Sequence, residues 1–143
     1  MLPRWRLDAT PERFCFTVED AAFASHARGV FQTYLRRYAA SESDVDAAEL
    51  IFGELVANVA RHAPGPIRAL LEWTPDGAVL EVRDTGPGFD FLASLPPDDA
   101  ENHRGLYIVS VLAGRVVQRR GADGTVMAVD LPLRKAGTGA ARR

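Results

Sequence analysis

The chain has 143 residues, of which 47% are hydrophobic and 25% are charged, and its formal net charge at neutral pH is −2. This composition indicates one ordinary globular domain, which can bury an apolar core without disulfides or bound metal. A sequence pI near 5.9 argues against nucleic-acid binding, because domains that bind nucleic acid are usually basic. The single cysteine excludes an intramolecular disulfide. One cysteine and three scattered histidines also give no support to a structural zinc site.

The two ends of the chain show no targeting or membrane segment. No stretch approaches the roughly 18 consecutive apolar residues of a membrane-spanning helix, and the first ten residues lack the apolar block of a signal peptide. Together with the lone cysteine, this favours a cytoplasmic protein. We expect an N-terminal extension at residues 1–9, one domain at residues 10–133, and a disordered basic tail at residues 134–143.

The first half of the chain predicts one strand followed by two helices. Residues 13–18 alternate apolar and polar side chains, which is typical of a half-buried strand. From residue 19 to residue 38 the apolar side chains recur every three or four positions, as on one face of an amphipathic helix. Ser43 or Asp44 can cap a second helix at residues 49–63, ELIFGELVANVARHA, which ends at the sequence APGP.

The second half predicts two pairs of strands, separated by a loop and a third helix. Pro75-Asp76-Gly77 is a hairpin turn, because proline presets one backbone angle and glycine frees the next. Residues 90–103 have no sustained periodicity, and a loop of this length is usually functional or mobile. The predicted elements are strands at 67–73 and 78–84, a helix at 104–113, and strands from about 116 and at 125–131.

Each predicted strand has one apolar and one more polar face, which suits a sheet that is covered on one side only. The expected order is one strand, two helices, two strands, a long loop, one helix and two strands. We therefore predict an α/β (α+β) two-layer sandwich, with a mixed, mostly antiparallel sheet covered on one face by three helices. A doubly wound nucleotide-binding sheet would need regular crossovers and fully apolar strands, which this sequence lacks.

Polar residues interrupt the apolar pattern at two places. Glu54, Asn58 and His62 follow one another at intervals of four, so they lie along one side of the second helix, beside its apolar stripe. When this helix is considered by itself, the three polar residues are equally well explained as a solvent-exposed flank and as part of a functional site. Asp84 falls on the apolar face at the end of its strand, where an acid is either paired or functional. A glycine-rich loop, TGPGF, follows it directly.

These residue types suggest the chemistry of a nucleotide site. An asparagine offers a neutral oxygen to Mg2+, a cation that proteins normally share with phosphates. A buried carboxylate can accept a hydrogen bond from the exocyclic amine of adenine, and glycines after it let the backbone approach a ligand. The N–H groups at the helix start near Gly105 can hold phosphates, and Glu54 can position or deprotonate a hydroxyl group. Each feature alone has an ordinary structural explanation, and it is their joint order that points to a site.

Four segments resemble the motifs of the GHKL, or Bergerat-fold, superfamily of ATP-binding domains. ELVANVARHA resembles its N box, DTGPGF and HRGLYIV its two glycine boxes, and GTVMAVDLPL its closing strand, so that the resemblance covers about residues 10–133. The short chain and the form of its N box resemble the anti-sigma-factor serine kinase branch. Members of this branch bind a sigma factor, and they use ATP to phosphorylate a serine on a STAS-domain anti-sigma-factor antagonist. The resemblance implies these partners and suggests a homodimer.

The resemblance also implies roles for the matching residues. Glu54 would be the general base toward the substrate serine, and Asn58 would coordinate Mg2+. His62 matches a basic N-box position near the phosphates, although it could equally cap the helix end, where cations are favoured. Asp84 would accept the adenine amino group, and Thr125 would support Asp84 directly or through a water. The residues implied to bind ATP are Asn58, His62, Asp84, Gly86, Gly88, Arg104, Gly105, Leu106 and Thr125.

The phosphate end of the implied site departs from the family pattern. Gly105 and Leu106 would present backbone N–H groups to the phosphates beside the charge of Arg104, and residues 90–104 would form a lid. Many relatives have two or more glycines in this box, whereas here His103 and Arg104 precede a single glycine. This departure motivates a second hypothesis, a nucleotide-holding module that sequesters its partner and is catalytically weak. A third hypothesis is a detached histidine-kinase catalytic domain with a separate phosphoacceptor.

Overall fold

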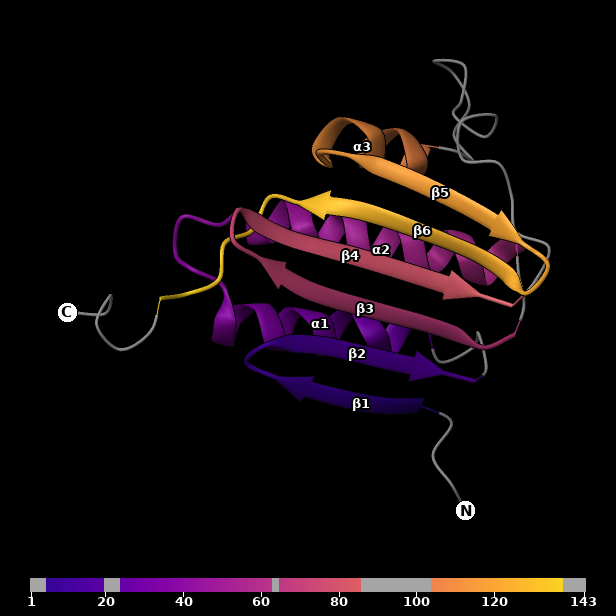
Figure 1. Ribbon diagram of the computed structural model, residues 1–143, viewed down its shortest axis with the longest axis horizontal. Helices are drawn as coiled ribbons and strands as arrows, with labels where there is room; N and C mark the ends of the chain where they lie inside the picture. The colour runs from indigo at the N-terminus through magenta and orange to yellow at the C-terminus, as the bar shows by residue number, and fades with distance from the viewer. Residues whose placement is uncertain (1–4, 20–23, 63–64, 86–103, 138–143) are drawn as a thin grey trace.

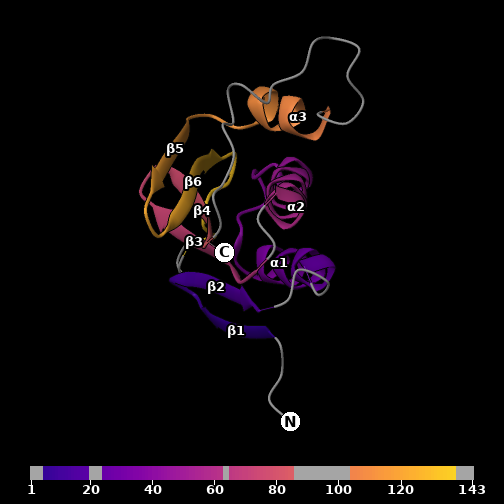
Figure 2. The same ribbon diagram turned by 90° about the vertical axis from the view of Figure 1, so that its right-hand side faces the viewer.

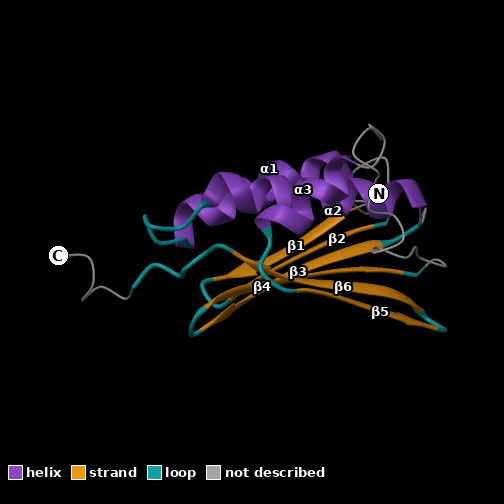
Figure 3. Ribbon diagram, turned by 90° about the horizontal axis from the view of Figure 1, so that it is seen from above, coloured by secondary structure: helices purple, strands orange, loops and turns teal. Residues whose placement is uncertain are grey.

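The computed structural model describes residues 5–19, 24–62, 65–85 and 104–137. In these residues one six-stranded sheet has the strand order β1-β2-β3-β4-β6-β5, and every neighbouring pair is antiparallel. The three described helices cover one face of the sheet and leave the other face open (Figure 3), which confirms the predicted two-layer α+β architecture. The elements are β1 (Trp5–Thr10), β2 (Arg13–Val18), α1 (Ala24–Tyr38), α2 (Val45–His62), β3 (Ile67–Thr74), β4 (Gly77–Asp84), α3 (Arg104–Leu112), β5 (Val116–Gly121) and β6 (Gly124–Leu131).

The apolar core fills the space between the sheet and the helical layer. Figure 1 shows the strands side by side with α1 and α2 behind them, and Figure 2 shows the helices in one layer in the order α1, α2, α3. Phe14 of β2, Phe31 of α1 and Phe52 of α2 are fully buried. The rings of Phe31 and Phe52 stack at 4.1 Å between centroids, and Phe14 meets Phe31 edge-on at 5.3 Å. These contacts fix both long helices against the sheet.

Helix α2 begins at Val45, earlier than the apolar periodicity alone predicts. Asp44, one of the two predicted caps, precedes it, and its Oδ1 accepts a 3.0 Å hydrogen bond from the backbone N–H of Ala47. This bond satisfies a donor that the first helical turn leaves without an internal partner. None of the helices in the described ranges is both long and apolar enough to cross a membrane.

The N-terminal residues form an edge strand instead of the expected extension. Strand β1 pairs along its length with β2, and Thr10 Oγ1 accepts hydrogen bonds from the N–H groups of Glu12 and Arg13 in the turn, both at 3.2 Å. Trp5 and Leu7 are 39% and 42% exposed, so the segment lacks the buried face that sequence patterns detect. The strand forms because pairing with β2 satisfies its backbone groups, which is a tertiary effect.

The first residues of the expected disordered tail are held against the connection between α1 and α2. Ser43 and Arg134 exchange two hydrogen bonds: the N–H of Arg134 donates to Ser43 Oγ at 2.8 Å, and that hydroxyl donates to the Arg134 carbonyl at 3.0 Å. The N–H of Ala136 donates to the carbonyl of Tyr38 at 2.7 Å. The prediction that disorder begins at residue 134 is therefore wrong for residues 134–136.

The buried hydroxyl of Tyr34 joins three elements of the fold. It donates a 2.8 Å hydrogen bond to the carbonyl of Thr10 at the end of β1, and it accepts a 3.0 Å bond from Nε1 of Trp73 on β3. Burial raises the pKa of Tyr34 above its usual value, because the phenolate would be poorly solvated there. The neutral hydroxyl is thus the form that the folded state favours.

We expect Tyr34→Phe to lower the free energy of unfolding by about 1–3 kcal/mol, because it leaves the Trp73 N–H and the Thr10 carbonyl without this partner. The control is Tyr38→Phe, since the Tyr38 hydroxyl has no hydrogen bond in the described part of the chain. In urea titrations the deficit of the Tyr34 variant should be complete below about pH 10 and shrink above it, because the unfolded tyrosine then ionises while the native Tyr34, whose pKa is raised, stays neutral. Equal unfolding midpoints for the two variants at pH 7 would contradict this role.

Candidate functional site

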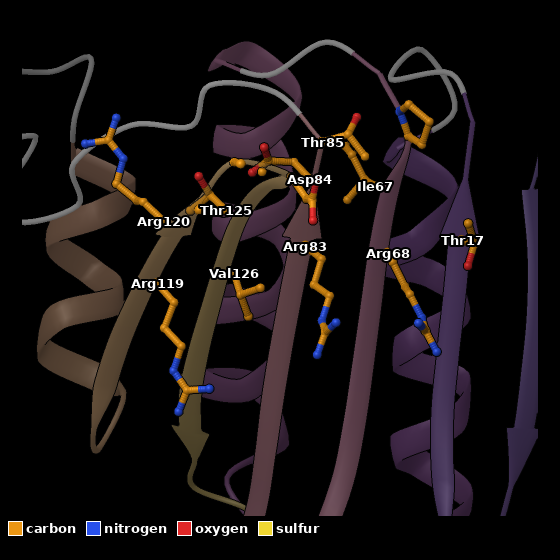
Figure 4. A pocket seen from close by; sticks show the side chains of 15 residues that line it. Thr17, Ile67, Arg68, Arg83, Asp84, Thr85, Arg119, Arg120, Thr125 and Val126 are labelled. Carbon is orange, nitrogen blue, oxygen red and sulfur yellow. The ribbon is translucent and has the colours of Figure 1, made fainter.

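The ends of β4 and β6 bring two predicted site residues together (Figure 4). Asp84, the last residue of β4, lies opposite Thr125 of β6 in the sheet register, and strand alternation turns both toward the helix-covered face. Asp84 is 6% exposed and Thr125 is 2% exposed. The Thr125 hydroxyl has no hydrogen-bond partner among the described residues. A buried hydroxyl in this state costs free energy that a ligand or a bound water can offset.

The turn before Thr125 approaches the end of β4 closely. Gly124 has a φ of 128°, a left-handed conformation that side chains rarely adopt. A side chain at this position would also collide with the backbone carbonyl of Asp84 and crowd the Cα of Thr85. The glycine therefore sets how closely the β5–β6 turn approaches the end of β4, and with it the placement of Asp84 beside Thr125.

On α2, Asn58 is buried in the apolar surroundings of the helix. Its side chain is 4% exposed, and its amide nitrogen has no hydrogen-bond partner in the described part of the chain. A half turn of the amide exchanges its oxygen and nitrogen, so either atom can be presented to a ligand. An unpaired buried group of this kind costs roughly 1–3 kcal/mol, which an apolar side chain of similar size would avoid. A contact from a ligand or a bound water at this amide would offset that cost.

Glu54 lies one turn before Asn58 on the same helix and is half-buried. It faces a groove of about 440 Å³ between α1 and α2, which Ser25, Arg28 and Gly53 also line. Glu54 makes no hydrogen bond or ion pair with another described residue. Asn58 does not line this groove. The structure thus keeps the carboxylate and the amide one turn apart, as predicted, but only the carboxylate opens on the groove.

Helix α3 packs against α2 and carries the predicted phosphate-binding segment at its start (Figure 2). Its first residues are Arg104, Gly105 and Leu106. The backbone N–H groups of a first helical turn have no partner within the helix, as an anion site requires. The predicted features that lie outside the described residues are the side chains of His62, Arg104 and Leu106, the glycines Gly86 and Gly88, and the lid residues 90–103.

Sequence reasoning missed a buried acid on α2. Glu49 is 8% exposed, its Oε2 accepts a 3.3 Å hydrogen bond from Nε2 of Gln32, and its Oε1 has no partner among the described residues. Helical spacing could have identified it, because Glu49 precedes Phe52 by three positions and Val56 by seven. Glu49 therefore lies on the apolar stripe of the helix. Its contact with Gln32 links α1 to α2.

We expect Gly124→Ala to lower the free energy of unfolding by about 1–3 kcal/mol or more, because the variant combines backbone strain with a collision at the Asp84 carbonyl. The matched control is Gly121→Ala in the same hairpin, where a side chain would meet nothing within 4 Å. Urea denaturation of both variants tests this constraint. A Gly124→Ala protein as stable as the Gly121→Ala protein would show that the close approach of the turn to β4 is not required.

A family model described as the histidine kinase-like ATPase domain matches residues 16–130. No curated protein sequence matches the chain. The structure is similar to the histidine kinase AdeS of Acinetobacter baumannii, with a TM-score of 0.52 at 13% identity, covering 93% of this chain and 69% of that chain. It is also similar to a histidine kinase domain from a blue-light activated histidine kinase of Erythrobacter litoralis, with a TM-score of 0.44 at 19% identity, covering 81% of this chain and 62% of that chain.

At 13% identity the AdeS structure shows a shared fold alone. The chain spans less than two thirds of the Erythrobacter litoralis protein. The family match runs from within β2 to within β6, so it includes the Asp84–Thr125 pair and the α2 residues Glu54 and Asn58. The chain belongs to the histidine kinase-like ATPase domain family.

Proposed function

We propose that this chain is an ATP-dependent serine kinase that acts on a protein partner. The observation that carries the proposal is the pair of buried polar groups, Asn58 and Thr125, without hydrogen-bond partners among the described residues. Both belong to segments that resemble the nucleotide-binding motifs of the superfamily. Because such groups are costly when unpaired, ATP and Mg2+ fit the residues present as the ligands that complete their contacts.

The site residues divide between the two ends of the nucleotide. Asp84, beside Thr125, would accept the adenine amino group, with Gly86 and Gly88 in the loop around the base. Asn58 would hold Mg2+ through its amide oxygen, and the cation, when bound, offsets charge on the phosphates. The residues proposed to contact the phosphates are His62, Arg104, Gly105 and Leu106.

Glu54 is suited to activate the acceptor hydroxyl. Its carboxylate has no pairing cation among the described residues and opens on the groove between α1 and α2, so it is available to take a proton. In the proposed step the acceptor oxygen attacks the terminal phosphorus, the bond from that phosphorus to the ADP oxygen breaks, and the hydroxyl proton passes to Glu54. The proposed acceptor is a serine on a STAS-domain anti-sigma-factor antagonist, and the second partner is a sigma factor. A homodimer belongs to the same proposal.

A second candidate is a histidine-kinase catalytic domain that serves a separate phosphoacceptor protein, which the family description and the fold of AdeS favour. The two candidates differ in the chemistry of the product. Phosphoserine survives acid, whereas phosphohistidine is lost in acid and survives base. Incubation with labelled ATP and partner proteins from the source cells, followed by acid and base treatment, therefore separates them. Stable complexes without any label transfer would favour a partner-sequestering module instead.

We expect Glu54→Gln to bind ATP with unchanged affinity and to transfer phosphate at least about 100-fold more slowly, because the amide cannot accept the hydroxyl proton. Glu42→Gln is the control, since Glu42 is exposed in the connection between α1 and α2. Nucleotide binding is measured by calorimetry and transfer by labelled ATP. Undiminished transfer in the Glu54 variant would remove Glu54 from the catalytic role.

We expect Thr125→Val to leave the free energy of unfolding unchanged or raised, because it replaces an unpaired buried hydroxyl by an apolar group of the same shape. The same variant should bind ATP roughly tenfold more weakly, the equivalent of one lost hydrogen bond of about 1.4 kcal/mol. Thr74→Val, at the exposed end of β3, is the control for both measurements. A destabilised variant with normal ATP affinity would mean that Thr125 serves the fold and not the nucleotide.

A further inference from the structure

The open face of the sheet carries a row of arginines. Cross-strand partners in the sheet register form one continuous line over all six strands, on the face that no described helix covers (Figure 3). Four of the six positions are arginine, and these four side chains are exposed. The row, from β1 to β5, is Arg6, Thr17, Arg68, Arg83, Val126 and Arg119. We call it the arginine row.

The arginine row is electrostatically unfavourable without a partner. Arg68 lies directly opposite Arg83, and like charges at opposed positions of neighbouring strands destabilise a sheet. Local compensation is limited: Arg83 pairs with Glu81 at 2.9 Å, and Nε of Arg68 donates to Cys15 Sγ at 3.3 Å. Arg119 makes no ion pair with another described residue. Excess positive charge therefore remains across β3, β4 and β5.

A groove of about 470 Å³ lies along one side of the arginine row, toward the end of β4. Figure 4 shows the side chains of Arg68, Arg83 and Arg119 extending the same way over the open face, from three different strands. The groove is also lined by two acids and three threonines, which are Asp84, Asp123, Thr17, Thr85 and Thr125, so it reaches the strand ends that carry the candidate site. The guanidinium fork suits carboxylates, which it can bind with two parallel hydrogen bonds.

The dimensions of the arginine row select an extended ligand. Neighbouring strands are about 4.8 Å apart, so three strand spacings separate Arg68 from Arg119 by about 14 Å. A single small anion cannot span that distance. An extended peptide rises about 3.3 Å per residue, so carboxylates at its first, third and fifth positions lie about 13 Å apart and on one side. Acidic residues at alternate positions therefore match the overall length of the row. The long arginine side chains can take up the uneven spacing, which is one strand separation between Arg68 and Arg83 and two between Arg83 and Arg119.

We propose that the arginine row binds an extended acidic segment of a protein partner, laid across the strands with alternate carboxylates on Arg68, Arg83 and Arg119. This inference goes beyond the proposed kinase function, because the row lies on the face opposite Asp84 and Asn58. The neighbouring rows of the same face disfavour nucleic acid. They carry Glu81 and, one row further, Glu72 and Asp130, which repel a wide polyanion but leave room for a single strand of peptide.

The test uses the full chain without nucleotide and a labelled seven-residue peptide in which glutamate alternates with serine. Fluorescence anisotropy should show binding that weakens steeply with salt, as for contacts between exposed charges. Arg83→Gln and Arg119→Gln should each lower the affinity at least fivefold, and the double variant further. Arg36→Gln, on the exposed side of α1, is the control and should bind as the native chain does.

Four further measurements decide the outcome. A peptide with glutamine in place of glutamate should not bind, and circular dichroism should show that both row variants are folded, since these side chains are exposed. Equal peptide affinity in the row variants and the Arg36 control would overturn the proposal. A single-stranded oligonucleotide that binds the row more tightly than the peptide would also overturn it, as would a dimer of this chain that the row substitutions dissociate. The peptide-binding test contains no ATP. Loss of peptide binding in this test is therefore distinguishable from a lack of the proposed kinase activity.

Discussion

The antiparallel register between β4 and β6 is the constraint on which both faces of this protein depend. It places Asp84 beside Thr125 on the helix-covered face and Arg83 beside Val126 on the open face. Because side chains alternate along a strand, a slip of one residue would exchange these two sets. The register is held by the fully buried Leu80, Val82 and Met127, which would lose their core positions in the same slip. Core packing on β4 and β6 thus fixes the site indirectly.

Three polar groups in this core lack complete hydrogen bonding among the described residues, and they are not equivalent. Asn58 and Thr125 each have one buried atom without a partner among those residues, and both lie in segments that resemble nucleotide-binding motifs. Glu49 has the same deficit at one oxygen, yet its other oxygen bonds Gln32 across the α1–α2 contact. We propose a ligand as the partner of the first two groups, whereas Glu49 already has a structural partner. Burial alone does not distinguish the three groups, because Asn58, Thr125 and Glu49 are all buried.

The parts of the fold with strong local periodicity could be predicted from sequence. The hairpin of β3 and β4, the amphipathic character of α1 and α2, and the placement of Asp84 on the covered face all follow from side-chain spacing. Strand β1 could not be predicted, because its apolar residues Trp5 and Leu7 stay partly exposed and its pairing with β2 is what makes it a strand. The bonds between Ser43 and Arg134 join residues 91 positions apart, which no local pattern contains.

The arginine row could be predicted only in part, and the reason lies in topology. The turn at Pro75-Asp76-Gly77 sets Arg68 opposite Arg83, so that pair could be inferred from the hairpin alone. The continuation to Arg119 depends on β6 lying between β4 and β5, a neighbour relation that sequence order does not give. Arg83 and Asp84 are consecutive residues of β4, yet Arg83 lies on the positively charged open face and Asp84 lies on the helix-covered face. A ligand that shifted this strand end on one face would change the affinity of the other, and thermodynamic linkage would make the effect reciprocal.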